Sequence, residues 1–365
     1  AGYDGYYYED DQEYPFRTAH HFRHYCPVEG AGHAIVLVPG KKPLLFYFCP
    51  EDFWYEHLAP GEPFWAASFE IRTFNSKESI WKALEAFKHC AYLGPDNKLA
   101  REQGFTVAPE SFEHHLNWHR ANKSLYEASC VERATEIASL GHRAARAEFL
   151  NGGSEFDIQM AYLSATRMKD RDLPYTAIVG LDEKAAILHY PAKRDDVRDG
   201  KVLLIDSGAS FCGYASDITR THVSKSVPAE FASMLAAMDQ EQQALCESIH
   251  IGMNFGELFH ASHEAVGRVI LDHGLLNGVA LEEAIDKGLT HVFYPHGVSH
   301  MLGINVHDVG SKQLDLAGTM YEKDEKQPTK TTMRAIEAGH LFTVEPGLYF
   351  IEMLLDKERQ GQHKD

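Results

Sequence analysis

Apolar residues recur along this chain with two different periods, and the periods predict which segments are strands and which are helices. In the first third, β-branched and aromatic runs at 34–38 and 44–48 flank a Pro-Gly-Lys-Lys-Pro turn, a pattern typical of strands. Between 76 and 87, apolar residues recur every three or four positions, which predicts an amphipathic helix. These elements predict a small α/β domain over residues 1–112.

Longer helical patterns dominate the remaining residues, 113–365. An apolar stripe at helical spacing begins after Ser124 and ends at the pair Gly152–Gly153. Ser154 with Asp157 then has the spacing of an N-cap, which predicts the start of a second helix. Two further helical patterns cover about 228–250 and 256–273.

Short apolar runs lie between and after these helices, and we expect them to be strands. They are 177–179, 186–190, 202–206, 291–293 and 341–350. Helices mixed with antiparallel strands indicate a larger α+β domain over 113–365, so the whole chain is predicted to be α+β with two domains.

Composition narrows the class of protein. The 365 residues exceed one ordinary core, and a hydrophobic content of 44% is enough to build two. A formal net charge of -18 argues against nucleic acid or an anionic membrane as the main partner. The six cysteines are scattered without a CxxC pair, which favours reduced thiols. Because we find neither a signal-peptide pattern nor a membrane-length apolar run, we expect a cytoplasmic protein.

Asp206 and Asp217 are the first candidates for chemistry. Asp206 ends the apolar run 202–206, and a Gly-rich turn returns the chain toward Asp217. A strand, turn and return strand would bring the two carboxylates together, where they repel unless a cation lies between them. A pair of divalent metal ions would resolve this repulsion. The simpler alternative, one turn aspartate and one surface aspartate, stays open for each residue taken alone.

Histidines and a glutamate form the second candidate group. His296, His300 and His307 fall within twelve residues and are interleaved with glycines, which allow close approach of backbone to a site. Their spacing is not that of a zinc finger. Glu345 ends an apolar run before a Pro-Gly turn, where a carboxylate is unfavourable unless it is paired or ligates a metal.

Taken in order, these motifs resemble those of the creatinase/aminopeptidase metallopeptidases, which have the pita-bread fold. Within that family the chain is most similar to bacterial Xaa-Pro dipeptidases (prolidases), including the organophosphorus acid anhydrolases. The resemblance covers nearly the whole chain and rests on six segments: 8–16, 52–55, 186–190, 206–221, 295–308 and 345–349. It implies a C-terminal pita-bread domain behind the small N-terminal α/β domain.

The resemblance also implies roles for individual residues. The implied metal ligands are Asp206, Asp217, His300 and Glu345, with Glu345 also transferring a proton. His296 and His307 match histidines that orient substrate and stabilise the tetrahedral intermediate. The implied substrate-pocket residues are Tyr175, Leu188, His189 and Trp54. Asp11 matches an acidic residue that reaches the site of a partner subunit, which implies a homodimer.

Two positions depart from the family pattern. Ser299 stands where the family usually has glycine before the ligand histidine. The family's fifth ligand, a second glutamate on a late strand that also carries an arginine, has no match after Glu345, because Glu352 and Glu358 lie in a polar context. Either the last strands of the domain lie outside this chain or the site has four ligands of five.

The function expected from the resemblance is a dipeptidase that hydrolyses small Xaa-Pro dipeptides with a hydroxide bridging two divalent ions, Mn²⁺ in view of the oxygen-rich ligand set. Organophosphate hydrolysis is expected as a side activity, because a tetrahedral phosphorus centre resembles the peptide intermediate. Two alternatives remain open: a non-catalytic pita-bread binding module, which the missing glutamate favours, and an Xaa-Pro aminopeptidase acting on longer peptides.

Overall fold

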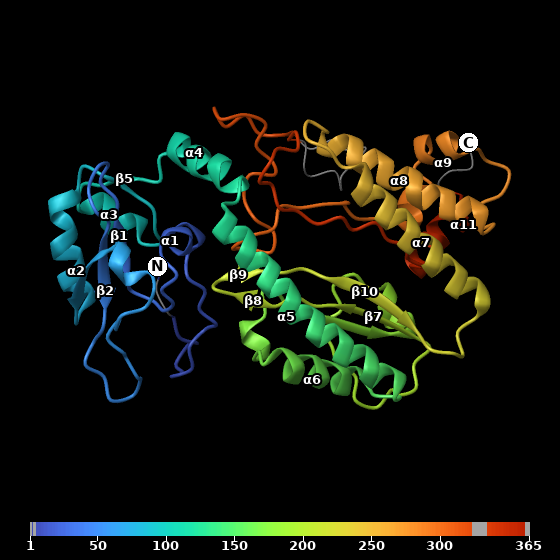
Figure 1. The fold of residues 1–365 in the computed structure, drawn as a ribbon, viewed down its shortest axis with the longest axis horizontal. Coiled ribbons are helices and arrows are strands. Elements are labelled where there is room, and N and C mark those ends of the chain that lie inside the picture. The colour runs from blue at the N-terminus through green and yellow to red at the C-terminus, as the bar shows by residue number, and fades with distance from the viewer. Residues whose placement is uncertain (1, 3–4, 323–333, 362–365) are drawn as a thin grey trace. The chain divides into compact units, whose positions relative to one another are not determined.

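The structure, a computed structural model, describes residues 2, 5–322 and 334–361, and the chain divides into two compact units (Figure 1). The first unit is Ala1–Glu113 and the second is His114–Asp365. No helix among the described residues is both long and apolar enough to cross a bilayer.

The N-terminal unit is built on a three-stranded sheet. Strand β2 (Leu44–Phe48) lies between β1 (Ala34–Val36), which is antiparallel to it, and β3 (Glu70–Phe74), which is parallel. Helix α2 (Lys77–Leu84) begins where the Ser76 hydroxyl accepts a hydrogen bond from the Ser79 amide at 3.1 Å. The smaller elements of the unit are α1 (His20–Tyr25), η1 (Ala66–Ser68), η2 (Glu85–Phe87), β4 (Ala91–Tyr92), α3 (Asn97–Glu102) and β5 (Thr106–Val107). Both predicted strands and the predicted helix are present.

Helix α4 (Glu110–Ala121) leads into the C-terminal unit, where two long helices follow. Helix α5 (Leu125–Leu150) begins with a capping box between Ser124 and Glu127, and α6 (Glu155–Thr166) begins with one between Ser154 and Asp157. These helices lie against each other beside the sheet (Figure 1). The sequence prediction of both helices and of the second N-cap is confirmed.

The sheet of this unit has β7 (Val202–Asp206) at its centre. Strands β6 (Ile178–Leu181) and β10 (Thr219–Val223) flank it, and both are antiparallel to it. Beyond β7 the chain continues into a short hairpin of β8 (Ser210–Phe211) and β9 (Tyr214–Ala215). Buried side chains of α5, α6, β6 and β7 form one core, so α5 and α6 cover one face of the sheet.

A second helical layer follows the sheet. Helices α7 (Ala229–Ser248) and α8 (Phe255–Asp272) pack together over the largest core of the unit, as their sequence patterns predicted. The remaining elements are η3 (Asp170–Asp172), η4 (Asp182–Ala186), α9 (Leu281–Asp286), α10 (Thr290–Phe293) and α11 (Glu352–Arg359).

Three predicted strands are wrong. In 186–190, Ala186 ends η4 and the following residues form a turn, where Ile187, Leu188 and His189 are exposed. Residues 291–293 lie in the short helix α10. A buried helical turn is as apolar as a buried strand, so the apolar pattern alone did not separate the two. Residues 341–350 are extended but form only an isolated bridge, Met301 to Phe342, in place of a ladder.

Candidate metal centre

The two aspartates share one face of a single long hairpin. Strands β7 and β10 place Asp206 opposite Thr219, and the Ser207 amide then donates to the Ile218 carbonyl at 3.1 Å. The same register continues into β8 and β9, so Gly208 lies opposite Asp217. Because side chains alternate between faces, Asp206 and Asp217 lie on the same face.

Glycine is required at position 208. A Cβ there would overlap the carbonyl oxygen of Ser216 on the opposite strand. The missing side chain lets the two strands approach closely next to Asp217. The Gly-rich turn seen in the sequence therefore has a steric cause inside the hairpin.

The opposite face of the hairpin rests on the helices. The Ser216 hydroxyl donates to the Ala134 carbonyl of α5 at 3.2 Å, and His142 Nε2 donates to the Ser207 carbonyl at 2.9 Å. Tyr162 of α6 donates from its hydroxyl to the Gly208 carbonyl at 2.9 Å. All these groups are buried, so the backbone that carries both aspartates is held from behind.

His300 and Glu345 come from two extended segments that lie side by side. The Thr343 amide donates to the His300 carbonyl at 3.1 Å, and the Glu345 amide donates to the Val298 carbonyl at 2.8 Å. His300 Nδ1 donates to the Met301 carbonyl at 3.1 Å, which turns Nε2 toward the carboxylates. Nε2 lies 3.2 Å from Asp217 Oδ2 and 3.0 Å from Glu345 Oε1. Asp217, His300 and Glu345 each offer one ligand atom within 4.8 Å of the others.

Tyr175 links Asp206, the third carboxylate, to this group. Its hydroxyl lies 2.6 Å from Asp206 Oδ1 and 2.9 Å from Asp217 Oδ1. One hydroxyl hydrogen serves one acceptor at a time, so Tyr175 bridges the aspartates without neutralising either. The resemblance placed Tyr175 in the substrate pocket, and the structure places it directly between two implied metal ligands.

The electrostatics of the group favour a bound cation. Burial, followed by the neighbouring Asp217, raises the pKa of Asp206 to about 7. Burial alone would lower the pKa of His300, but hydrogen bonds to Asp217 and Glu345 outweigh it and raise that pKa to about 10. Burial likewise opposes ionisation of Glu345, yet His300 holds its pKa below the ordinary value. Protonated His300 thus supplies the positive charge that these carboxylates need. Three carboxylates and one imidazole form a donor set that fits divalent metal ions.

Two more predicted histidines adjoin the group. The His307 ring centroid lies 4.2 Å from that of His300. His296 donates from Nδ1 to the Gly297 carbonyl at 2.9 Å, and its Nε2 lies 3.1 Å from the Tyr349 hydroxyl. Burial raises the pKa of Tyr349, so its hydroxyl keeps the proton that it donates to His296. Sequence reasoning assigned no role to Tyr349, although the residue belongs to the same motif as Glu345.

The remaining predicted residues are exposed. Leu188 and His189 follow η4 on the surface. Burial and the neighbouring His300 lower the pKa of His307, and His189 adds a smaller effect in the same direction. Trp54 and Asp11 belong to the N-terminal unit, and both are exposed. Their predicted roles stay predictions.

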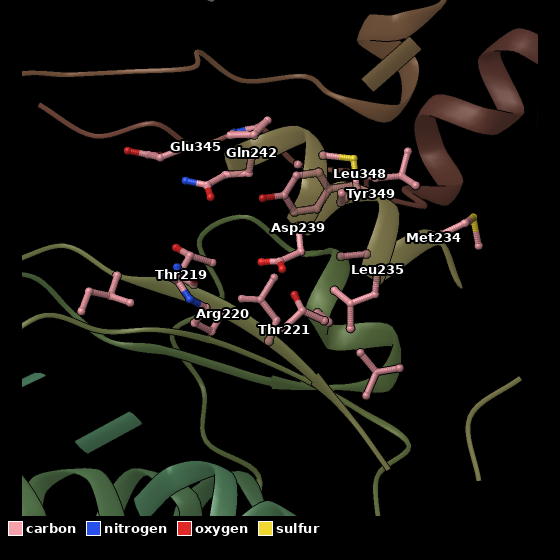
Figure 2. A pocket seen from close by; sticks show the side chains of 18 of the residues that line it. Thr219, Arg220, Thr221, Met234, Leu235, Asp239, Gln242, Glu345, Leu348 and Tyr349 are labelled. Atoms are coloured by element: carbon pink, nitrogen blue, oxygen red, sulfur yellow. Dashed lines mark hydrogen bonds between the residues drawn. The ribbon is translucent and has the colours of Figure 1, made fainter. Parts of the chain in front are cut away.

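A cavity of about 1710 Å³ opens beside the carboxylates. Figure 2 shows it between side chains of β10, α7 and the segment around 345–349. The residues labelled there are Thr219, Arg220, Thr221, Met234, Leu235, Asp239, Gln242, Glu345, Leu348 and Tyr349. The cavity gives a small molecule access to Glu345 and Asp217.

Comparison with known proteins assigns the chain to a family. The model of metallopeptidase family M24 matches residues 129–363, which include all four implied ligands, and a model described as Xaa-Pro dipeptidase, N-terminal domain, matches residues 1–118. The chain belongs to metallopeptidase family M24.

Curated relatives agree along almost the whole chain. An Xaa-Pro dipeptidase of Pseudoalteromonas translucida is 40% identical over 97% of this M24 chain and 81% of its own length. An Xaa-Pro dipeptidase of Shewanella woodyi is 38% identical with the same coverage. The family resemblance predicted from the motifs is thereby confirmed.

Solved structures confirm the fold. A zinc-substituted Escherichia coli aminopeptidase P in complex with product has a TM-score of 0.75 at 22% identity, covering 94% of this chain and 80% of its own. Proline aminopeptidase P II from Yersinia pestis has a TM-score of 0.73 at 24% identity, covering 96% and 83%. The M24 unit therefore has the pita-bread fold, and the α+β prediction is confirmed.

Proposed function

We propose that this M24 protein is a metal-dependent dipeptidase that hydrolyses the bond between residue X and proline in Xaa-Pro dipeptides. One observation carries the proposal: Asp217, His300 and Glu345 converge within 4.8 Å, and Tyr175 ties Asp206 to them. The relatives named Xaa-Pro dipeptidase, 38–40% identical, support the substrate class.

Asp206, Asp217, His300 and Glu345 would hold two divalent ions, and the oxygen-rich set suits Mn²⁺. Ions bound there supply Lewis-acid chemistry, acidifying water and polarising the scissile carbonyl. In the metal-loaded site His300 gives up the proton on Nε2, because this nitrogen is the atom that faces the carboxylates.

The chain's own residues carry the proton transfers and the orientation of substrate. Glu345 would be ionised as a metal ligand, so it would accept a proton from the attacking water and deliver it to the proline nitrogen. His296 is fixed as a neutral imidazole by Gly297 on one nitrogen and Tyr349 on the other. In this tautomer Nε2 is a hydrogen-bond acceptor, and the proposed role of His296 is to orient the substrate. His296 could stabilise an oxyanion only if Nε2 were protonated. His307 supplies the second imidazole at the oxyanion.

The family resemblance supports substrate-binding roles for Leu188, His189 and Trp54, and a homodimer in which Asp11 would act at the site of the partner subunit. The relatives named Xaa-Pro dipeptidase favour a dipeptidase over an aminopeptidase. The same site would hydrolyse organophosphates slowly, because their tetrahedral phosphorus resembles the peptide intermediate.

The test is hydrolysis of Leu-Pro and Gly-Pro by Mn²⁺-loaded protein, with Leu-Ala and an Xaa-Pro-Yaa tripeptide as comparisons. We expect turnover of the two Xaa-Pro dipeptides alone. Faster cleavage of the tripeptide would favour the aminopeptidase, and no turnover of any peptide would contradict the proposal.

The alternative to be tested is a non-catalytic binding module. In the part of the chain that the structure describes, neither Glu352 nor Glu358 joins the cluster of Asp217, His300 and Glu345. Metal analysis separates the two: about two ions per subunit supports the enzyme, and none supports the binding module.

A further inference from the structure

The hairpin that carries Asp206 and Asp217 ends in a two-residue turn, Cys212–Gly213. Both residues have positive φ, 50° and 84°, as a tight turn between antiparallel strands requires. Glycine adopts this conformation freely, but cysteine rarely does. Cys212 is exposed at the tip of the hairpin.

A second cysteine lies directly under this tip. Cys130 of α5 is 2% exposed and packs in one cluster with Tyr214 and Ala215 of the hairpin. Its thiol is within hydrogen-bonding reach of the Cys212 thiol and of the Tyr126 hydroxyl. Two thiols from segments far apart in the chain therefore face each other, one buried and one open to solvent.

Neighbouring contacts hold the two thiols in place. The Tyr214 hydroxyl donates to Glu127 Oε1 at 3.2 Å, and the rings of Tyr214 and Tyr126 meet edge to face at 6.3 Å. One helical turn further along α5, the Ala134 carbonyl accepts from Ser216. The tip of the hairpin is thus anchored to α5 on both sides of Cys130.

We propose that Cys130 and Cys212 are a redox modification site that forms a reversible intramolecular disulfide on exposure to a peroxide. The Cys212 thiolate attacks one oxygen of hydrogen peroxide, forming an S–O bond and breaking the O–O bond. The hydroxide released takes up a proton and leaves as water. The Cys130 sulfur then attacks the sulfur of the Cys212 sulfenic acid, forming the S–S bond and releasing a second water.

The reaction is balanced, because two thiols and one peroxide give one disulfide and two waters, with each sulfur losing one electron. The order of attack follows from exposure. Cys212 meets the oxidant in solvent, whereas burial raises the pKa of the Cys130 thiol and leaves it to react second.

The disulfide would bind the tip of the hairpin covalently to α5. Asp206 and Asp217 lie on the face of this hairpin that points away from α5, so the bond would fix their backbone without entering the metal centre. It would also protect Cys212 from irreversible oxidation to the sulfinic acid. The inference depends on the packing of α5 and the hairpin and does not depend on the proposed peptidase activity.

The experiment uses the wild-type protein, treated with hydrogen peroxide, alkylated, and digested with trypsin without reductant. Cleavage after lysine and arginine leaves Cys130 in peptide 124–133 and Cys212 in peptide 202–220, one cysteine in each. We expect mass spectrometry to find these two peptides linked, and dithiothreitol to separate them.

Cys246 provides the matched control, because it is also exposed in the same unit but lies on α7, where its sulfur accepts a hydrogen bond from Gln242 at 3.3 Å. A Cys246→Ser variant should form the linked peptide as wild type does, and a Cys212→Ser variant should not. The proposal is overturned if oxidised wild-type protein carries Cys212 as sulfinic acid, as an intermolecular disulfide or as free thiol, without the linked peptide. This readout needs no variant to fold.

Discussion

A buried ion cluster holds the loop that carries His300 and His307, and its removal should destabilise the protein strongly. Asp308 directly follows His307, and its carboxylate accepts from Arg120 at 2.9 Å and pairs with Lys123 Nζ at 3.1 Å. All three side chains are 1–3% exposed. The Asp308 amide also donates to the Met301 carbonyl at 2.8 Å, which closes the loop on itself.

The expected loss of folding stability can be estimated from this burial. An Asp308→Ala substitution removes the carboxylate with which both buried cations pair. Breaking one buried ion pair by removing one partner destabilises a protein by about 3–5 kcal/mol. The loss here should lie at the upper end, because one carboxylate serves two cations. At 1.4 kcal/mol for each factor of ten, the unfolding equilibrium constant should rise by about a thousandfold to several thousandfold.

Urea unfolding of the variant, followed by circular dichroism, measures the change. Glu136→Ala is the matched control, because Glu136 pairs with Arg133 at the surface, where both side chains are more than half exposed. Removing an exposed pair costs about 0–1 kcal/mol. If Asp308→Ala lies within about 1 kcal/mol of wild type, as the control should, then the buried cluster does not hold the loop and the reasoning is wrong.

Four further predictions concern the site and the buried histidines. Gly208→Ala should push the two strands of the hairpin apart, so metal analysis should find less than the wild-type metal content; a full complement would contradict the steric argument. Glu345→Gln removes a ligand charge and the proton carrier, so the kcat for Leu-Pro should fall by about 10²–10⁴-fold. An unchanged kcat would show that another residue transfers the proton. Tyr349→Phe removes the hydrogen bond to His296, worth about 1 kcal/mol, so kcat/KM should fall by roughly five- to tenfold while the circular dichroism spectrum is unchanged. His263 is 2% exposed, and burial lowers its pKa to about 3. Between about pH 6.5 and 3 this histidine is therefore protonated in the unfolded chain and neutral in the folded protein, so the free energy of unfolding should fall as the pH drops through this window. The melting temperature of a His263→Gln variant should depend on pH less steeply than that of wild type.

The parts of the site that are local in sequence were predictable. Asp206 and Asp217 lie on one hairpin, so a strand, a glycine-containing turn and a return strand are enough to bring them together. The capping box of Ser154 and Asp157 is equally local, because both partners lie within one helical turn. In each case the contacting residues are close in the sequence, so the pattern of residue types is enough to predict the contact.

The wrong strand predictions also have physical reasons. The run 291–293 is apolar because Val292 and Phe293 face the core, and burial alone makes a short helix look like a strand. In 186–190 only Tyr190 is buried, where its hydroxyl donates to the buried carboxylate of Glu155 at 3.0 Å. A contact across 35 residues fixes that segment, and periodicity does not record such contacts.

The assembly of the whole site depends on contacts between segments far apart in the sequence, and one part of the chain contributes to both halves of the site. Helix α5 holds the aspartate hairpin through the Ala134 carbonyl and His142. The residues just before α5 hold the histidine loop through Arg120 and Lys123. Both halves of the site are therefore positioned from one stretch, 120–142. Its sequence reads as an amphipathic stripe, because the groups that position the site are a main-chain carbonyl and buried charges, which hydrophobic periodicity does not detect. A substitution anywhere in this stretch that tilts α5 should shift the aspartates relative to His300, even where it touches no ligand.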